Sequence, residues 1–413
     1  MQDSRPSVNI WSRIPAIAAA VSLLLASARH VPAASLQFVG QNQQAGASAA
    51  VVVEGYALAH TAQLLPLDKQ GQAVGPGSVE AQLAQSLFNL ETALAAAGSG
   101  TAHLVKLNVY VDGPKTAAAA RAMLNKRFPL PRRPAMTWVT TALPHPRAGL
   151  ALDGVAVVPG QGPAAVERHR GAVLAGFDAA ACVAVLPRGE AVYVAGQAQK
   201  GELPIATAKT LERLLATIGH LGLKSSHVVH VKAFLRPMEQ ADLVREQLAQ
   251  AFAGQTPPPL TLVAWQSDLP VEIELIACVP PETAPPAGAD TVSYFTPPGM
   301  TKSPLYSRVA RVHGGKTIYV SGLYAEKPGS GEAQVRDLFA ALDSTLKLAG
   351  SDLRHLVKAT YYCADDESSA VLNKLRPEFF DPQRPPAASK AMVQGVAVAD
   401  RSITMDMIAV TPP

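Results

Sequence analysis

One stretch of about forty residues occurs three times in this chain, and this repetition constrains the fold more than any other feature. The copies start at Gly98, Gly222 and Gly350. In each copy a histidine follows the glycine by five residues, a phenylalanine by thirty, and the entry to an apolar strand by thirty-eight. The copies contain no insertion over this span and are offset by 124 and 128 residues. A period of this length predicts three tandem domains rather than a solenoid of short units.

Hydrophobic periodicity indicates the same order of elements in each copy: strand, strand, helix, strand, helix, strand, strand. In the first copy, residues 79–97 are expected to be helical, because four leucines at steps of four, three and four form one apolar stripe. Gly98 is expected to end this helix in a left-handed conformation. Val51–Val53 and Tyr56–Ala62 are expected to pair with each other around Glu54-Gly55. This order predicts an α+β fold with two helices on one face of a mixed sheet.

The expected domains are residues 36–158, 168–280 and 290–411, which we call repeats 1, 2 and 3. Pro- and Gly-rich linkers separate them at Pro159–Pro163 and Pro280–Gly288.

Residues 1–34 have the pattern of an export signal. Arg5 and Arg13 precede an apolar run of fifteen residues, Ile14–Ala28. Ala26-Ser27-Ala28, at the end of this run, is a cleavage site of the A-x-A kind. A secreted or periplasmic protein is therefore expected, with no membrane segment after cleavage. An uncleaved N-terminal anchor is the alternative.

Charge and cysteine content exclude several classes of protein. A net charge of +4 on 413 residues is too weak to indicate nucleic-acid binding, and the basic run at residues 126–133 is expected to be a solvated loop. The three cysteines form no metal motif and no disulfide framework. Cys182 and Cys278 could pair after export, but buried free thiols are favoured.

The repeats carry a specific combination of residues: Gln82, Asn89-Leu90 and Val105-Lys106 in repeat 1, Val192–Gln197 and Val271–Ala277 in repeat 2, and Tyr306-Ser307, Ile318–Gly322 and Met405–Val410 in repeat 3. In this combination the chain resembles the Rid/YjgF family, also labelled endoribonuclease L-PSP. The resemblance implies a trimer of such domains, with the sheets packed into a central barrel and ligand clefts between neighbours. Three fused copies would then form a pseudo-trimer by self-association within one chain.

The family's best-studied activity is the hydrolysis of enamine or imine intermediates, in which an arginine holds the substrate carboxylate through a charge-assisted pair. At the arginine position this chain has Met136, Leu260 and Ala388. Ordinary imino-acid deamination is therefore expected to be absent or very weak.

The resemblance also gives candidate site residues. Asp153, Glu274 and Asp406 stand in the last strands, where the family has its glutamate, and could activate water; a purely structural role is the alternative. Tyr306 and Ser307 match a family pocket motif, and Gln197 matches a family turn. Lys390 lies two residues beyond Ala388, so it could replace the arginine if it does not simply face solvent.

Equivalent histidines, His103, His227 and His355, could meet on a common axis and bind a metal, but exposed positions at strand starts are favoured. We therefore expect no metal and no cofactor. The favoured function is binding of a small molecule in interdomain clefts. The alternative is an enamine/imine deaminase-type hydrolase with altered substrate range, which would use the repeat 3 cleft.

Overall fold

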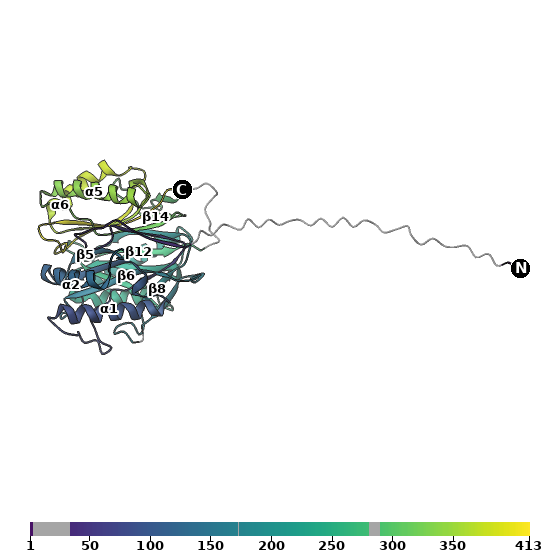
Figure 1. The fold of residues 1–413 in the computed structure, drawn as a ribbon, viewed down its shortest axis with the longest axis horizontal. Coiled ribbons are helices and arrows are strands. Elements are labelled where there is room, and N and C mark those ends of the chain that lie inside the picture. Colours follow the sequence, from purple (N-terminus) through teal and green to yellow (C-terminus); the bar gives the residue numbers. More distant parts are fainter. Residues whose placement is uncertain (3–33, 172, 281–289) are drawn as a thin grey trace. The chain divides into compact units, whose positions relative to one another are not determined.

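The computed structural model describes residues 1–2, 34–171, 173–280 and 290–413 (Figure 1), and residues 3–33 of the expected export signal lie outside this part. The three repeats belong to one compact unit. Within the described residues, no helix is both long and apolar enough to cross a membrane.

Each repeat contributes strands and helices in the expected order, with one additional short strand at its start. Repeat 1 contains β1 (Ser35–Val39), β2 (Ala50–Glu54), β3 (Ala57–Thr61), α1 (Val79–Ala96), β4 (Leu104–Val111), α2 (Pro114–Arg127), β5 (Ala135–Thr140) and β6 (Leu150–Val158). Repeat 2 contains β7 (Glu167–Arg170), β8 (Ala181–Leu186), β9 (Ala191–Ala198), α3 (Leu203–Gly219), β10 (Val228–Leu235), α4 (Ala241–Ala251), β11 (Leu260–Ala264) and β12 (Val271–Cys278). Repeat 3 contains β13 (Val292–Phe295), β14 (Val309–Val312), β15 (Thr317–Val320), α5 (Gly331–Leu348), β16 (Leu356–Cys363), α6 (Asp366–Phe379), β17 (Ala387–Met392) and β18 (Ile403–Val410).

The expected α+β fold of three tandem domains is confirmed. In each repeat one pair of strands is parallel, β4–β5, β10–β11 or β16–β17, and a helix connects the two strands. A crossover helix is the usual connection between parallel neighbours. The three glycines that mark the copies, Gly98, Gly222 and Gly350, have φ values of 70°, 72° and 76°. This is the left-handed conformation expected where a helix ends.

The sheets exchange strands between repeats. Three six-stranded sheets are present among the described residues, with the orders β1-β2-β15-β18-β16-β17, β5-β4-β6-β3-β8-β7 and β11-β10-β12-β9-β14-β13. Each sheet thus consists of four strands of one repeat and the first two strands of another. The exchange closes a cycle, because repeat 1 completes the sheet of repeat 3, repeat 2 that of repeat 1, and repeat 3 that of repeat 2.

The predicted pairing of residues 51–53 with 56–62 is therefore wrong. β2 pairs with β1 and β15, whereas β3 pairs with β6 and β8. Gly55, at a φ of 70°, lies where the chain passes from one sheet to the other. The local sequence pattern could not show which strand β2 pairs with. Strand β15 is the repeat 3 counterpart of β3, so both offer β2 an equivalent edge.

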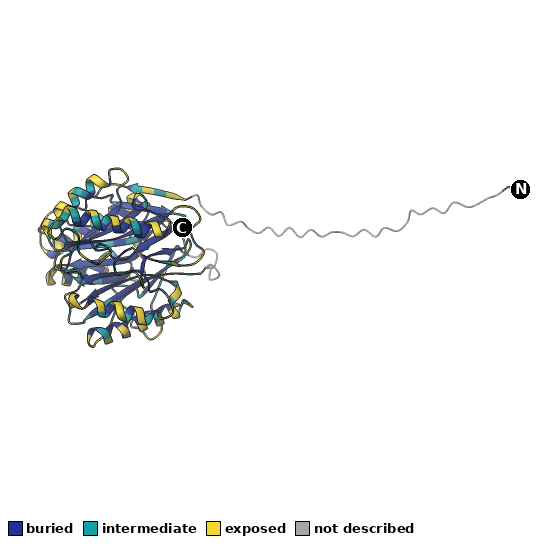
Figure 2. Cartoon of the chain, turned by 90° about the horizontal axis from the view of Figure 1, so that it is seen from below, coloured by how far each residue is buried: buried dark blue, intermediate teal, exposed yellow. Residues whose placement is uncertain are grey.

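Helices cover the outer faces of the sheets, and the inner faces pack against one another. Figure 2 shows the strands almost wholly in the buried colour, whereas the helices carry exposed residues along one side. Three apolar clusters fill the space between sheets and helices. A fourth contains inner-face residues of all three sheets, among them Val53, Val155, Tyr193 and Val410. The expected central barrel is not confirmed, since the strands form separate sheets.

Candidate functional site

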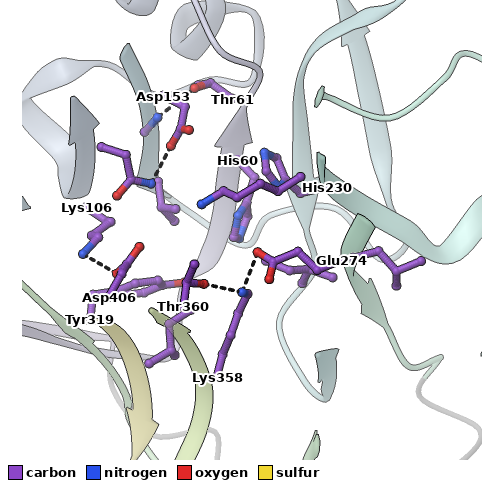
Figure 3. A pocket seen from close by; sticks show the side chains of 17 residues that line it. His60, Thr61, Lys106, Asp153, His230, Glu274, Tyr319, Lys358, Thr360 and Asp406 are labelled. Carbon is purple, nitrogen blue, oxygen red and sulfur yellow. Dashed lines mark hydrogen bonds and ion pairs between the residues drawn. The ribbon is translucent and has the colours of Figure 1, made fainter. Parts of the chain in front are cut away.

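Side chains from all three repeats line one cavity of about 60 Å³, which we call the central cavity (Figure 3). The structure places the three predicted acids together here, Asp153 on β6, Glu274 on β12 and Asp406 on β18. Basic side chains share the cavity with them: Lys106, Lys232, Lys358, His60 and His230.

Two of the acids form buried ion pairs with lysines of a neighbouring repeat. Lys106 Nζ lies 2.7 Å from Asp406 Oδ1, and Lys358 Nζ lies 2.6 Å from Glu274 Oε1. Ser389 Oγ also donates a hydrogen bond to Glu274. Breaking such a pair is costly because it leaves one charge buried without a partner. These pairs link repeat 1 to repeat 3 and repeat 3 to repeat 2.

The third acid, Asp153, has no lysine partner among the described residues. His230 lies eight residues after its glycine, at the position that Lys106 and Lys358 hold in the other repeats. Asp153 accepts hydrogen bonds from Asn108 Nδ2 and Tyr110 OH, both at 2.7 Å, and from Thr261 Oγ1 at 2.9 Å. The Thr261 hydroxyl is also 3.2 Å from His230 Nε2. In place of a third ion pair, hydrogen bonds therefore connect His230 through the Thr261 hydroxyl to Asp153.

Burial keeps both histidines of the central cavity neutral at pH 7. It lowers the pKa of His60 to about 3, and the nearby His230 lowers it as well. Burial also lowers the pKa of His230 to about 3, assisted by Lys232 and Lys358. For Asp406 burial opposes ionisation, but Lys106 and Lys232 outweigh it and lower its pKa overall. Asp406 is therefore ionised where it meets Lys106.

A second, larger cavity of about 540 Å³ lies between repeats 1 and 2, and we call it the 1–2 cleft. Repeat 1 lines it with Gln63 and Leu65 after β3 and with Asn89 of α1; repeat 2 lines it with α4 and the start of β11. Most of the other lining groups are apolar, among them Leu64, Leu67, Leu174, Phe177, Leu248, Pro258, Leu260 and Leu262. This volume is typical of small-molecule sites.

The 1–2 cleft contains Leu260, one of the three residues at the family's arginine position. Gln63 N donates to Leu260 O at 3.0 Å, and Gln63 Nε2 donates to Leu262 O at 2.9 Å. The wall is therefore held by backbone contacts between the two repeats. At the cleft's edge, Asp242 and Arg245 form an exposed ion pair of 2.6 Å, which leaves Glu246 and His145 as the other titratable groups of the lining.

The other predicted ligand-binding residues lie outside both cavities as lined by the described residues. Gln197 Nε2 donates to Thr217 Oγ1 at 2.9 Å, and its Oε1 has no partner. Lys390 Nζ donates to Ser369 Oγ at 2.6 Å, so it binds a helix of its own repeat.

Tyr306 and Ser307 lie close to the start of β17. Ser307 N donates to Pro386 O at 3.0 Å, and the Arg308 guanidinium lies 5.0 Å from the centre of the Tyr306 ring. Ser307 is thus placed beside the strand that carries Ala388, whereas Lys390 is directed to α6.

Sequence reasoning missed Glu272, which precedes Glu274 by two residues. Burial, and then the charge of Glu274, raise its pKa to about 8, while the charges of Lys358 and Lys390 act in the opposite direction. A Cβ atom at Gly196 would lie 2.1 Å from Glu272 Oε1, so the glycine makes room for this carboxyl. Glu272 therefore carries a proton at neutral pH.

The central lysines were also missed as site residues, although a signal exists. Lys106 and Lys358 interrupt apolar strands at the same offset from the repeat glycine. By contrast, the equivalent histidines lie apart from the central cavity: His355 Nδ1 is 2.7 Å from Asp352 Oδ1, and His227 Nδ1 accepts from Lys224 N. Among the described residues, no cluster of three or more His, Cys, Asp or Glu side chains could hold a metal ion. Cys182, Cys278 and Cys363 are buried and free.

Comparison with known proteins gives the family. The model of the family described as endoribonuclease L-PSP matches this chain three times, over residues 43–158, 177–279 and 300–411. The chain belongs to the endoribonuclease L-PSP family. No match was found among curated proteins.

Two solved structures each match 29% of this chain. A YjgF family member from Neisseria meningitidis is 24% identical over 29% of this chain and 94% of its own, with a TM-score of 0.23. A Rid family protein of unknown function from Yersinia pestis is 22% identical over 29% of this chain and 98% of its own, with a TM-score of 0.26. The threefold match of the family model, rather than these likenesses, carries the assignment.

Proposed function

We propose that this protein binds a small, largely apolar molecule without a carboxylate in the 1–2 cleft. The observation that carries the proposal is a 540 Å³ cavity between two repeats, with Leu260 in its wall where the family has arginine. A cavity of this size lined by apolar groups gains affinity by removing apolar surface from water, at about 25 cal/mol per Å².

The charges around the 1–2 cleft determine which ligand charge it favours. A leucine in place of the guanidinium removes the ionic partner of a carboxylate and leaves an apolar wall that penalises burial of that charge. Asp242 and Arg245 neutralise each other, so Glu246 gives the lining a net negative charge. An amine or alcohol is therefore favoured over an acid of the same shape.

Calorimetry with three matched ligands tests this proposal: 3-phenylpropylamine, 3-phenylpropanol and 3-phenylpropanoate. We expect affinity to fall in that order. Ala249→Trp, on an exposed helical position that lines the cleft, should abolish binding. Ala119→Trp, on an exposed position of α2, is the matched control and should leave binding unchanged. Preference for the propanoate, or equal binding by the Ala249→Trp variant, would refute the proposal.

Imine hydrolysis is the second candidate, and Glu272 supports it. A carboxyl with a pKa of about 8 is a suitable general acid near neutral pH. The acids predicted from sequence support it less, because Asp406 and Glu274 are held in ion pairs and Asp153 by three donors. Release of keto acid from a freshly generated imino acid, lost in Glu272→Gln, would establish the hydrolase. We expect no release above the uncatalysed rate, since no repeat has the arginine.

Export is proposed on the sequence of residues 1–34 alone. Fractionation of the producing cell and determination of the protein's N-terminus test it. We expect exported protein that begins after Ala28. Intact protein confined to the cytoplasm would contradict the proposal.

A further inference from the structure

The central cavity contains polar groups that the ion pairs leave without partners. His60 Nε2, Asn108 Oδ1 and Tyr319 OH are buried, line the cavity and have no hydrogen-bond partner. Their residues are 3%, 7% and 1% exposed. A buried polar atom without a partner costs about 1–3 kcal/mol, so such atoms are normally met by water or a ligand.

Lys232 is the lining cation that lacks a close carboxylate. It is 6% exposed, and its hydrogen bond to Tyr362 OH is long, at 3.5 Å. Among the described residues, no carboxylate oxygen lies within 4.0 Å of its Nζ, whereas Lys106 and Lys358 have such partners at 2.7 and 2.6 Å. The equivalent positions in the other repeats hold the uncharged Asn108 and Thr360. Each repeat therefore contributes one lysine to the cavity, but repeat 2 carries its lysine two residues further along the strand, where no carboxylate of the described residues pairs with it.

We propose that the central cavity binds one small monovalent anion, held by the Lys232 ammonium and the Tyr319 hydroxyl. The cavity's 60 Å³ suits such an ion, since one water needs about 10–15 Å³ of such space. The carboxylates that line the cavity direct oxygens to other partners, Asp406 and Glu274 to lysines and Asp153 to Asn108, Tyr110 and Thr261. Lys232 and Tyr319 therefore have donors available for an anion.

Charge balance requires that a proton enters with the anion. The three lysines and three carboxylates of the lining offset one another, and both histidines are neutral. A lone anion would leave a net buried charge, which is strongly disfavoured. His60 is the acceptor of the proton, because its Nε2 has no partner among the described residues. The charges of His230 and Asp153 act on it, and the other titratable groups that line the same cavity are Lys106, Lys232, Lys358, Glu274, Asp406 and Tyr319. Anion affinity should therefore fall about tenfold for each unit of rising pH.

Bromide is the probe for this proposal. Crystals of the full chain grown in sodium bromide should show an anomalous peak in the central cavity beside Lys232. In solution, bromide should raise the melting temperature of the wild type more at pH 5.5 than at pH 7.5. Lys232→Asn, which gives repeat 2 the residue of repeat 1, should lose this rise. Lys209→Asn, at an exposed position of α3, should keep it.

His60→Gln separates the proton from the anion. It keeps a neutral polar side chain, so it should abolish the pH dependence of the bromide effect. Water alone in the cavity of the bromide crystals would overturn the proposal even if Lys232→Asn fails to fold. An equal bromide effect in the wild type and Lys232→Asn would overturn it as well.

Discussion

Leu260→Arg should convert the 1–2 cleft into a carboxylate site. Leu260 is partly buried at the start of β11 and lines the cleft, whose 540 Å³ has room for the longer side chain. The new guanidinium would stand at the family's arginine position and could grip a carboxylate through two parallel hydrogen bonds.

The expected gain follows from the value of a charge-assisted hydrogen bond in a partly buried site. Such a bond contributes about 1.5–3 kcal/mol, which corresponds to roughly 10- to 150-fold in affinity. We expect 3-phenylpropanoate to bind to the variant more tightly than to the wild type by this factor. The amine should bind more weakly, because the arginine repels it.

The assay is calorimetry of both ligands with the wild type and the variant. Leu348→Arg adds the same charge at an exposed position of α5 and should change neither affinity. Among the described residues, Glu246 is the lining carboxylate without an ion-pair partner and would compete for the new arginine, so Leu260→Arg/Glu246→Gln should gain at least as much as the single variant. If neither variant gains affinity for the propanoate while both fold, the assignment of the ligand site to this cleft is refuted.

Three further predictions concern the central cavity and the repeat itself. Asp406→Asn should lower the free energy of unfolding by about 3–5 kcal/mol in denaturant titrations, because it leaves Lys106 buried and unpaired. Because burial lowers the pKa of His60 and His230 to about 3, both histidines take up a proton when the protein unfolds between pH 3 and pH 6.5. The free energy of unfolding should therefore be unaffected by them above pH 6.5 and should fall as the pH drops towards 3, by up to ~1.4 kcal/mol per pH unit for each histidine. His60→Gln should remove about half of this slope. Gly98→Ala should cost roughly 1–2 kcal/mol, because its φ of 70° strains any other residue and no neighbour would contact the new Cβ.

Much of the secondary structure could be predicted because the same hydrophobic periodicity occurs in all three repeats. Helix α1 ends at Ala96, one residue before the predicted end, and Leu83, Leu90 and Leu94 of its leucine stripe are buried as expected. Strand β1 was missed because it is a short edge strand whose residues are mostly exposed or intermediate. Such a strand carries little apolar alternation.

The exchange of strands was beyond local sequence reasoning. Period-two alternation identifies β2 as a strand but does not choose between β3 and its counterpart β15 as the partner. The choice depends on how neighbouring repeats pack, and this information is distributed over the whole chain. The same limit applies to the acids, since the predicted strands did not reveal that all three meet lysines or hydroxyl groups from other repeats.

For the candidate ligand site, the sequence predicted the position of one residue but not the cavity around it. The sequence located Leu260 at the family's arginine position, but Leu174 and Phe177, which also line the cleft, lie outside the stretch that occurs three times in the chain. The role of Lys232 was hidden because its counterparts in the other repeats, Asn108 and Thr360, are uncharged. Repeats reveal what they share more readily than what one of them has changed.

A crystal structure of the full chain soaked with 3-phenylpropanol measures ligand placement directly. The account predicts density for the phenyl ring in the 1–2 cleft against Leu260, with the hydroxyl directed towards the cleft's edge near Glu246. Ligand density in a cleft beside Met136 or Ala388, with the 1–2 cleft holding only solvent, would contradict it.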